Sequence, residues 1–233
     1  MEDRLLYVND ELDKSLIDKI INGPVEATRC FLLVLNEMQV RNRQMFDKDI
    51  YYHNGEQYLR DEWCMIIVPF KKFKEYGIIK NNRSIEGIKD VLNKMYATYG
   101  RYIDIEGTCF DNKEKTLTVT FRYEYMLMNT GQSLLYPRSK YDKFIIIDLL
   151  QFTQLRSKIQ ILIYMKLMQF QKSRVVIIKI DEIREILETP LQVKELIRKI
   201  KNAIAKLEEV MQIKITLDTV KKGREITSIK LNF

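Results

Sequence analysis

Histidine, cysteine and proline are scarce in this chain of 233 residues, which contains one histidine, His53, three cysteines and four prolines. Enzymes that nick DNA with a tyrosine nucleophile use paired histidines to hold a metal ion, so a single histidine argues against that chemistry. The sequence also has no GxxxxGK[ST] phosphate loop, no GxSxG element and no zinc-ligand spacing. These absences argue against the common ATPases, hydrolases and zinc enzymes. We therefore expect no enzymatic activity, no metal and no cofactor.

Long hydrophobic runs are missing as well. No apolar stretch approaches the roughly 20 residues of a membrane-spanning helix, and the acidic start of the chain lacks the apolar segment of a signal peptide. The three cysteines, Cys30, Cys64 and Cys109, lie among apolar or β-forming residues without CxxC spacing. This pattern predicts reduced cysteines in the core. Together these features predict a cytoplasmic protein that makes no membrane contact.

Positive charge is present but unevenly distributed along the chain, whose net charge is +7. Residues 1–140 contain 21 Lys and Arg and 21 Asp and Glu, whereas residues 141–233 contain 18 and 11. All of the net charge therefore belongs to the C-terminal part. Such an asymmetry predicts a nucleic-acid-binding half joined to a half with another task.

The last 53 residues show the order helix, turn, longer helix, hairpin. A short helical pattern over 181–188, which we expect Asp181 to cap, breaks at Thr189-Pro190. A longer helix is predicted from Gln192 to about Val210. Two alternating segments, 212–218 and 225–233, then flank a turn of Lys221, Lys222, Gly223 and Arg224. This order is typical of a winged helix, in which a helix and a hairpin contact DNA.

The longer helix divides into an apolar face and a cationic face. Its apolar residues recur at spacings of three and four, which predicts one buried stripe: Val193, Leu196, Ile197, Ile200, Ala203, Ile204, Leu207 and Val210. The opposite face carries Lys194, Arg198, Lys201, Asn202 and Lys206. A helix in the major groove needs this division. The cations of the hairpin would repel one another without a counter-charge such as phosphate. A merely solvated helix face and hairpin is the alternative.

The same order of elements occurs earlier in the chain. A short helix is predicted over 10–21 and a loop over 47–56. Between and after them come a helix over 24–44, a strand over 63–68, a short helix over 70–76 closed by Gly77, a helix over 82–99, and strands over 101–110 and 116–125. A strand over 144–147, a helix over 153–170 and a strand over 175–180 precede the C-terminal elements. The repeated pattern predicts an α+β protein of two tandem winged-helix domains.

The predicted domain boundaries follow from these elements. They are a lead-in 1–23, a first domain 24–130, a linker 131–142 and a second domain 143–233.

Several short motifs resemble the plasmid replication initiator family. They are Leu155-Arg156-Ser157-Lys158 with Tyr164, Asp181-Glu182-Ile183-Arg184, and the Lys221–Arg224 turn leading into Ile226, Ile229, Leu231 and Phe233. The likeness extends over about 136–233 and is architectural over 24–125. It implies that the second winged helix binds repeated sites (iterons) in double-stranded DNA at a plasmid or phage origin. It also implies that Arg156 and Lys158 add to the DNA contacts, and that binding opens the origin and recruits host helicase or initiator proteins.

The first winged helix of that family contacts DNA in monomers or forms a dimer interface. Here the corresponding unit is electrically neutral, which favours self-association through residues 1–130. Secondary DNA contacts are predicted for its longer helix and its hairpin tip: Arg83, Ser84, Lys89, Lys94, Lys113 and Lys115. Two alternatives to an initiator are a winged-helix transcription regulator and a winged-helix adaptor that binds proteins without binding DNA.

Overall fold

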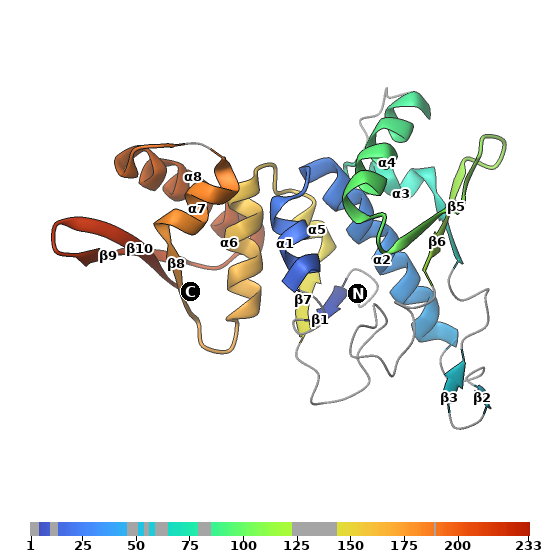
Figure 1. Ribbon diagram of the computed structural model, residues 1–233, viewed down its shortest axis with the longest axis horizontal. Helices are drawn as coiled ribbons and strands as arrows, with labels where there is room; N and C mark the ends of the chain where they lie inside the picture. Colours follow the sequence, from blue (N-terminus) through green and yellow to red (C-terminus); the bar gives the residue numbers. More distant parts are fainter. Residues whose placement is uncertain are drawn as a thin grey trace. The chain divides into compact units, whose positions relative to one another are not determined.

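The chain folds into two compact units, residues 1–153 and 154–233, each of which is drawn in Figure 1. The computed structural model describes residues 5–9, 14–45, 51–53, 56–58, 65–78, 85–122, 144–188 and 190–233. Each unit contains the same succession of helix, strand, short helix, longer helix and hairpin. The predicted α+β fold with two winged helices is therefore confirmed.

The first unit is built around one long buried helix. Its main elements are α1 (Lys14–Asn22), α2 (Val25–Met45), β4 (Met65–Pro69), α3 (Phe70–Glu75), α4 (Ile85–Tyr99), β5 (Ile103–Asp111) and β6 (Thr116–Phe121). The strands form an antiparallel sheet in the order β4-β6-β5. The Phe31 ring of α2 stacks on the Tyr99 ring of α4 with centroids 4.1 Å apart. Both rings are fully buried, so this pair lies at the centre of the core.

The boundary between the two units differs from the predicted linker. The segment predicted as a lead-in contains β1 (Leu5–Asn9), which pairs antiparallel with β7 (Phe144–Asp148). The strand predicted to begin the second domain is thus part of the first unit, as is the short helix α5 (Leu149–Phe152). Asn36 of α2 fixes this ribbon to the core because its Nδ2 donates to the Leu5 carbonyl at 3.1 Å. The predicted linker 131–142 lies outside the described residues.

The loop predicted over 47–56 is wrong in part, because β2 (Tyr51–His53) pairs with β3 (Glu56–Tyr58) as a short hairpin. The Asn54-Gly55 dipeptide between these two strands in the sequence is a common hairpin signal.

The prediction of core cysteines is correct for Cys30 and wrong for Cys109, which is exposed; Cys64 lies outside the described residues. Burial raises the pKa of the Cys30 thiol, so this thiol stays protonated. Cys109 follows an irregularity in β5, where Asp104 pairs with Thr120 but Cys109 pairs with Thr118. Three extra residues on β5 reverse the inward and outward alternation of its side chains. Cys109 therefore faces outward although simple alternation from the buried Ile103 would place it inside.

The second unit repeats the arrangement. Its elements are α6 (Lys158–Gln169), β8 (Val175–Lys179), α7 (Ile180–Leu187), α8 (Val193–Met211), β9 (Thr216–Lys222) and β10 (Glu225–Asn232). The antiparallel sheet has the order β8-β10-β9, which matches β4-β6-β5. Seven residues of α6 are buried, as its apolar sequence predicts. In the described part of the chain, no helix has both the length and the apolar character that crossing a membrane requires.

Two helix starts differ from the sequence prediction. α6 begins at Lys158, where Ser157 and Gln160 form a reciprocal capping box that satisfies free N–H groups of the first turn. α7 begins one residue earlier than expected, so Lys179 occupies the N-cap position without a side-chain cap bond. The predicted capping role of Asp181 is therefore wrong. Its carboxylate lies in the first turn, where the helix dipole still favours it.

Candidate nucleic-acid interface

The apolar face of α8 anchors this helix in the second unit. Six of the eight residues in the predicted stripe are buried, and α8 packs against α6. The other two, Val193 and Ile197, are half-buried. The first two turns of α8 therefore lie at the margin of the core, with their side chains more open to solvent than those of the later turns.

The opposite face of α8 is cationic and exposed. Lys194, Arg198 and Lys201 are all exposed and follow one another at helical spacings of four and three, so they form one line along the helix. Asn202 is exposed next to this line. The structure thus brings together four of the residues predicted to contact DNA. All four side chains lie on the side of the helix away from its buried stripe.

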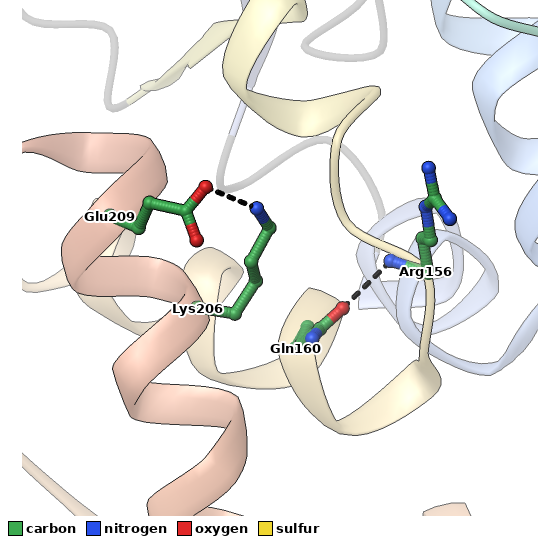
Figure 2. A network of polar contacts seen from close by, with 4 residues as sticks. All are labelled: Arg156, Gln160, Lys206 and Glu209. Atoms are coloured by element: carbon green, nitrogen blue, oxygen red, sulfur yellow. Dashed lines mark hydrogen bonds and ion pairs between the residues drawn. The ribbon is translucent and has the colours of Figure 1, made fainter.

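The acidic residues of α8 leave most of this positive charge uncompensated. Glu208 accepts a hydrogen bond from the Ile215 amide at 2.8 Å. Glu209 pairs with Lys206 at 2.6 Å, and Figure 2 shows this pair. Glu195 lies 3.9 Å from Arg198, a long distance for an exposed pair, which contributes little. Among the predicted contacts of this helix, Lys206 is the one whose charge is locally balanced.

One further cation of α8, Lys199, was missed by the sequence analysis. It is exposed, and within the described residues neither it nor Lys194 nor Lys201 has an ion-pair partner. The run Arg198-Lys199-Ile200-Lys201 was the available signal. Lys199 lies between the apolar stripe and the line of outward cations, so helical spacing alone does not place it on the cationic face.

The turn before α8 is held by α6. Glu188 ends α7 in the left-handed region, with φ of 51°, and its carboxylate pairs with Lys158 of α6 at 2.9 Å. A second pair, Lys166 with Glu182, joins α6 to α7 at 2.9 Å. These contacts position the start of α8. They also show that Lys158, predicted as a DNA contact, is engaged within the protein.

Arg156 precedes the capping box of α6. Its backbone N–H donates to Gln160 Oε1 at 2.7 Å, while its side chain points away from Gln160 (Figure 2). Arg156 is exposed. Its backbone is therefore fixed by the helix start, and its guanidinium group is accessible to an anion.

The hairpin β9–β10 carries three cations near its tip, which extends beyond the helices of the same unit (Figure 1). The strand begins at Thr216, later than predicted, because Gln212 ends α8 in the left-handed region. Lys221 and Lys222 therefore belong to β9, and the turn consists of Gly223, with φ of 64°, and Arg224.

The two lysines of β9 are not equivalent. Lys221 lies opposite Ile226, and Lys222 lies opposite Glu225. Consecutive residues of a strand point to opposite faces of the sheet. Lys222 thus shares its face with a carboxylate, whereas Lys221 has an apolar cross-strand neighbour. An anion would therefore meet more net positive charge at Lys221.

Cations of the first unit are interspersed with acids. Lys94 of α4 pairs with Asp90 at 2.9 Å, and Lys89 is exposed beside that pair. The hairpin tip exposes Lys113 and Lys115, between which lies Glu114. Arg83 and Ser84 lie outside the described residues. This unit has no cationic line like that of α8 among its described residues.

Comparisons with known proteins match the C-terminal residues by sequence and nearly the whole chain by structure. Residues 179–233 match the sequence model of the family described as initiator Rep protein, WH2. The chain is also similar in structure to the Pi initiator protein, solved in complex with iteron DNA, with a TM-score of 0.67 and 16% sequence identity. That alignment covers 99% of this chain and 97% of the Pi chain. No curated protein sequence matches this chain. The resemblance to replication initiators is confirmed by the match at 179–233, and the fold is confirmed over nearly the whole chain.

Proposed function

We propose that this protein is a replication initiator that binds repeated sites in double-stranded DNA at a plasmid or phage origin. The observation that carries the proposal is the uncompensated cationic face of α8, in the same unit that matches the initiator family model. The fold shared with the Pi initiator, which was solved on iteron DNA, supports it.

In this proposal α8 enters the major groove and the hairpin grips the DNA next to it. The Arg198 guanidinium is suited to guanine O6 and N7, and the Asn202 amide is suited to adenine. Lys194 and Lys201 neutralise phosphates, which supplies affinity independent of sequence. Lys221, Lys222 and Arg224 contact the phosphate backbone or a minor-groove edge. Base contacts would set specificity, while phosphate contacts would set the position of the protein.

The contribution to replication would be binding energy rather than a chemical step. Several copies bound to neighbouring repeats can deform the DNA between them, since part of each binding free energy can offset the cost of bending or untwisting. Origin opening and recruitment of host helicase or initiator proteins would follow from this assembly. The protein would act in the cytoplasm, where its DNA lies.

Self-association is proposed for the first unit. Its sheet has two edges, and β5 is interrupted between Asp104 and Cys109, which disfavours continuous pairing with another strand. Strand β4 is regular and exposes Met65 and Ile67 on its outer face. We expect a monomer–dimer equilibrium through β4. Ile67→Glu should shift light-scattering masses toward the monomer, and a concentration-independent monomer in the unsubstituted protein would refute the dimer.

The direct test is footprinting on DNA beside the gene. We expect protection of tandem direct repeats of about 20 base pairs, roughly two helical turns. Protection of a single palindrome would instead support a transcription regulator, because a symmetric dimer prefers palindromic half-sites. Absence of any DNA affinity at moderate salt would support the adaptor and overturn the proposal.

A further inference from the structure

The outer face of β8 exposes aliphatic side chains that the proposed DNA contact does not use. Ile177 has an exposed fraction of 60%, the largest among the exposed large hydrophobic residues described, and Val175 on the same face is 37% exposed. Val176 and Ile178 point to the opposite face and are buried. The exposed pair therefore lies on the side of the sheet away from its helices. Neither side chain is among the proposed DNA contacts.

β8 is also an edge strand, because the sheet order is β8-β10-β9. The Phe233 amide donates to the Arg174 carbonyl at 3.1 Å, so residue 174 is bonded toward β10. In an antiparallel strand the backbone N–H and C=O groups of every second residue point to the same side, and those of the residues between them point to the other side. The N–H and C=O of Ile177 consequently point to the open edge. At Val175 both groups contact Ser173 Oγ instead, at 3.5 and 3.0 Å.

The surroundings of Ile177 are cationic. Residues 171–180 contain Lys172, Arg174 and Lys179 and no acid, and all three are exposed. Lys230 of β10 lies directly opposite Ile177. None of these four cations has an ion-pair partner within the described residues. The acids on the same face lie further away: Asp218 of β9 accepts a hydrogen bond from Asn232 at 3.3 Å, and Glu225 lies opposite Lys222 near the hairpin tip.

We propose that Val175, Ile177, Lys179 and Lys230 form a docking surface, the β8 surface, for an extended acidic segment of a partner protein. The segment would add as a strand beside β8. Its backbone would bond the open groups of Ile177, its aliphatic side chains would cover Ile177 and Val175, and its carboxylates would pair with the flanking cations. This inference goes beyond the proposed function and does not depend on DNA binding. It gives an initiator a protein contact that uses none of the residues proposed to contact DNA.

The test is a binding titration of the full-length protein with a short labelled peptide. The peptide alternates valine and threonine at its centre and carries glutamates at both ends. We expect Ile177→Asp and Lys179→Glu each to weaken peptide binding by about tenfold or more, which corresponds to about 1.4 kcal/mol. The matched control is Ile105→Asp on β5, because Ile105 is an isoleucine 52% exposed on an edge strand of the first unit's sheet. That substitution should leave peptide affinity unchanged, and Ile177→Asp should leave duplex DNA affinity unchanged.

Three results would overturn the β8 surface. One is no peptide binding at millimolar concentration. Another is equal binding of a peptide with lysines in place of the glutamates. The third is a loss of duplex DNA affinity in Ile177→Asp and Lys179→Glu, which would assign the surface to DNA. Failure of the proposed function would give a different result. If the protein binds the acidic peptide but no DNA, the β8 surface is supported and the initiator role is contradicted.

Discussion

Arg198 is the α8 side chain best suited to reading a base, since 73% of it is exposed and Glu195 lies 3.9 Å away. We expect Arg198→Ala to cost about 1–3 kcal/mol on the cognate site and less on a scrambled duplex. Affinities for both duplexes at several salt concentrations would measure this difference. A suitable control is Arg184→Ala, because Arg184 belongs to α7 and pairs with Asp181. Equal losses on both duplexes would show that Arg198 does not read bases.

Lys221 and Lys222 provide a comparison between neighbouring residues on one strand. We expect Lys221→Ala to weaken binding to all sequences alike and to lower the salt slope by about one phosphate. Lys222→Ala should have a smaller effect, because Glu225 lies opposite Lys222 and offsets its charge. Glu225→Gln should then strengthen binding slightly. The slope of log affinity against log salt concentration measures all three, and equal slopes in the two lysine variants would contradict the assignment.

At the scale of elements, the packing of α2 against α4 contains a buried hydroxyl. Tyr99 Oη lies 2.7 Å from Thr28 Oγ1 and donates to the Lys19 carbonyl at 3.0 Å. Burial raises the pKa of Tyr99, so the folded protein keeps this group neutral at a pH where the unfolded chain ionises it. The stability from Tyr99 is therefore fully present below about pH 10 and is lost as pH rises further.

Denaturant unfolding between pH 9 and 11 would measure this effect. We expect the free energy of unfolding of the first unit to fall above about pH 10, with Tyr99 contributing about 1.4 kcal/mol per pH unit. In Tyr99→Phe the fall should be less steep, although the buried Cys30 thiol still contributes in the same direction. Identical slopes in the two proteins would mean that Tyr99 does not cause the alkaline loss.

At the scale of the whole molecule, the two units differ in net charge. Residues 154–233 contain 17 Lys and Arg and 9 Asp and Glu, whereas residues 1–153 contain 22 and 23. We expect residues 154–233, expressed alone, to bind duplex DNA more weakly than the full chain does, and residues 1–153 to bind poorly. Gel-shift titrations of both fragments, with circular dichroism to verify that each folds, would measure this. Equally tight binding by the first fragment would refute the division.

The sequence by itself determined the elements that depend on local periodicity and charge. The buried stripe of α8 follows from apolar residues at spacings of three and four, because a helix turns every 3.6 residues. The cationic line Lys194, Arg198 and Lys201 follows from the same geometry. The repeated order of elements was also visible, since each winged helix places its strands and helices consecutively along the chain.

Only the tertiary structure decided the features that join distant residues or depend on strand register. β1 pairs with β7 across more than half of the chain, and no local pattern contains that information. Cys109 faces outward because extra residues in β5 reverse the alternation. Lys158 pairs with Glu188 because α6 and the turn before α8 meet in space. Lys221 and Lys222 differ because a strand partner, rather than a sequence neighbour, determines which charge each one faces.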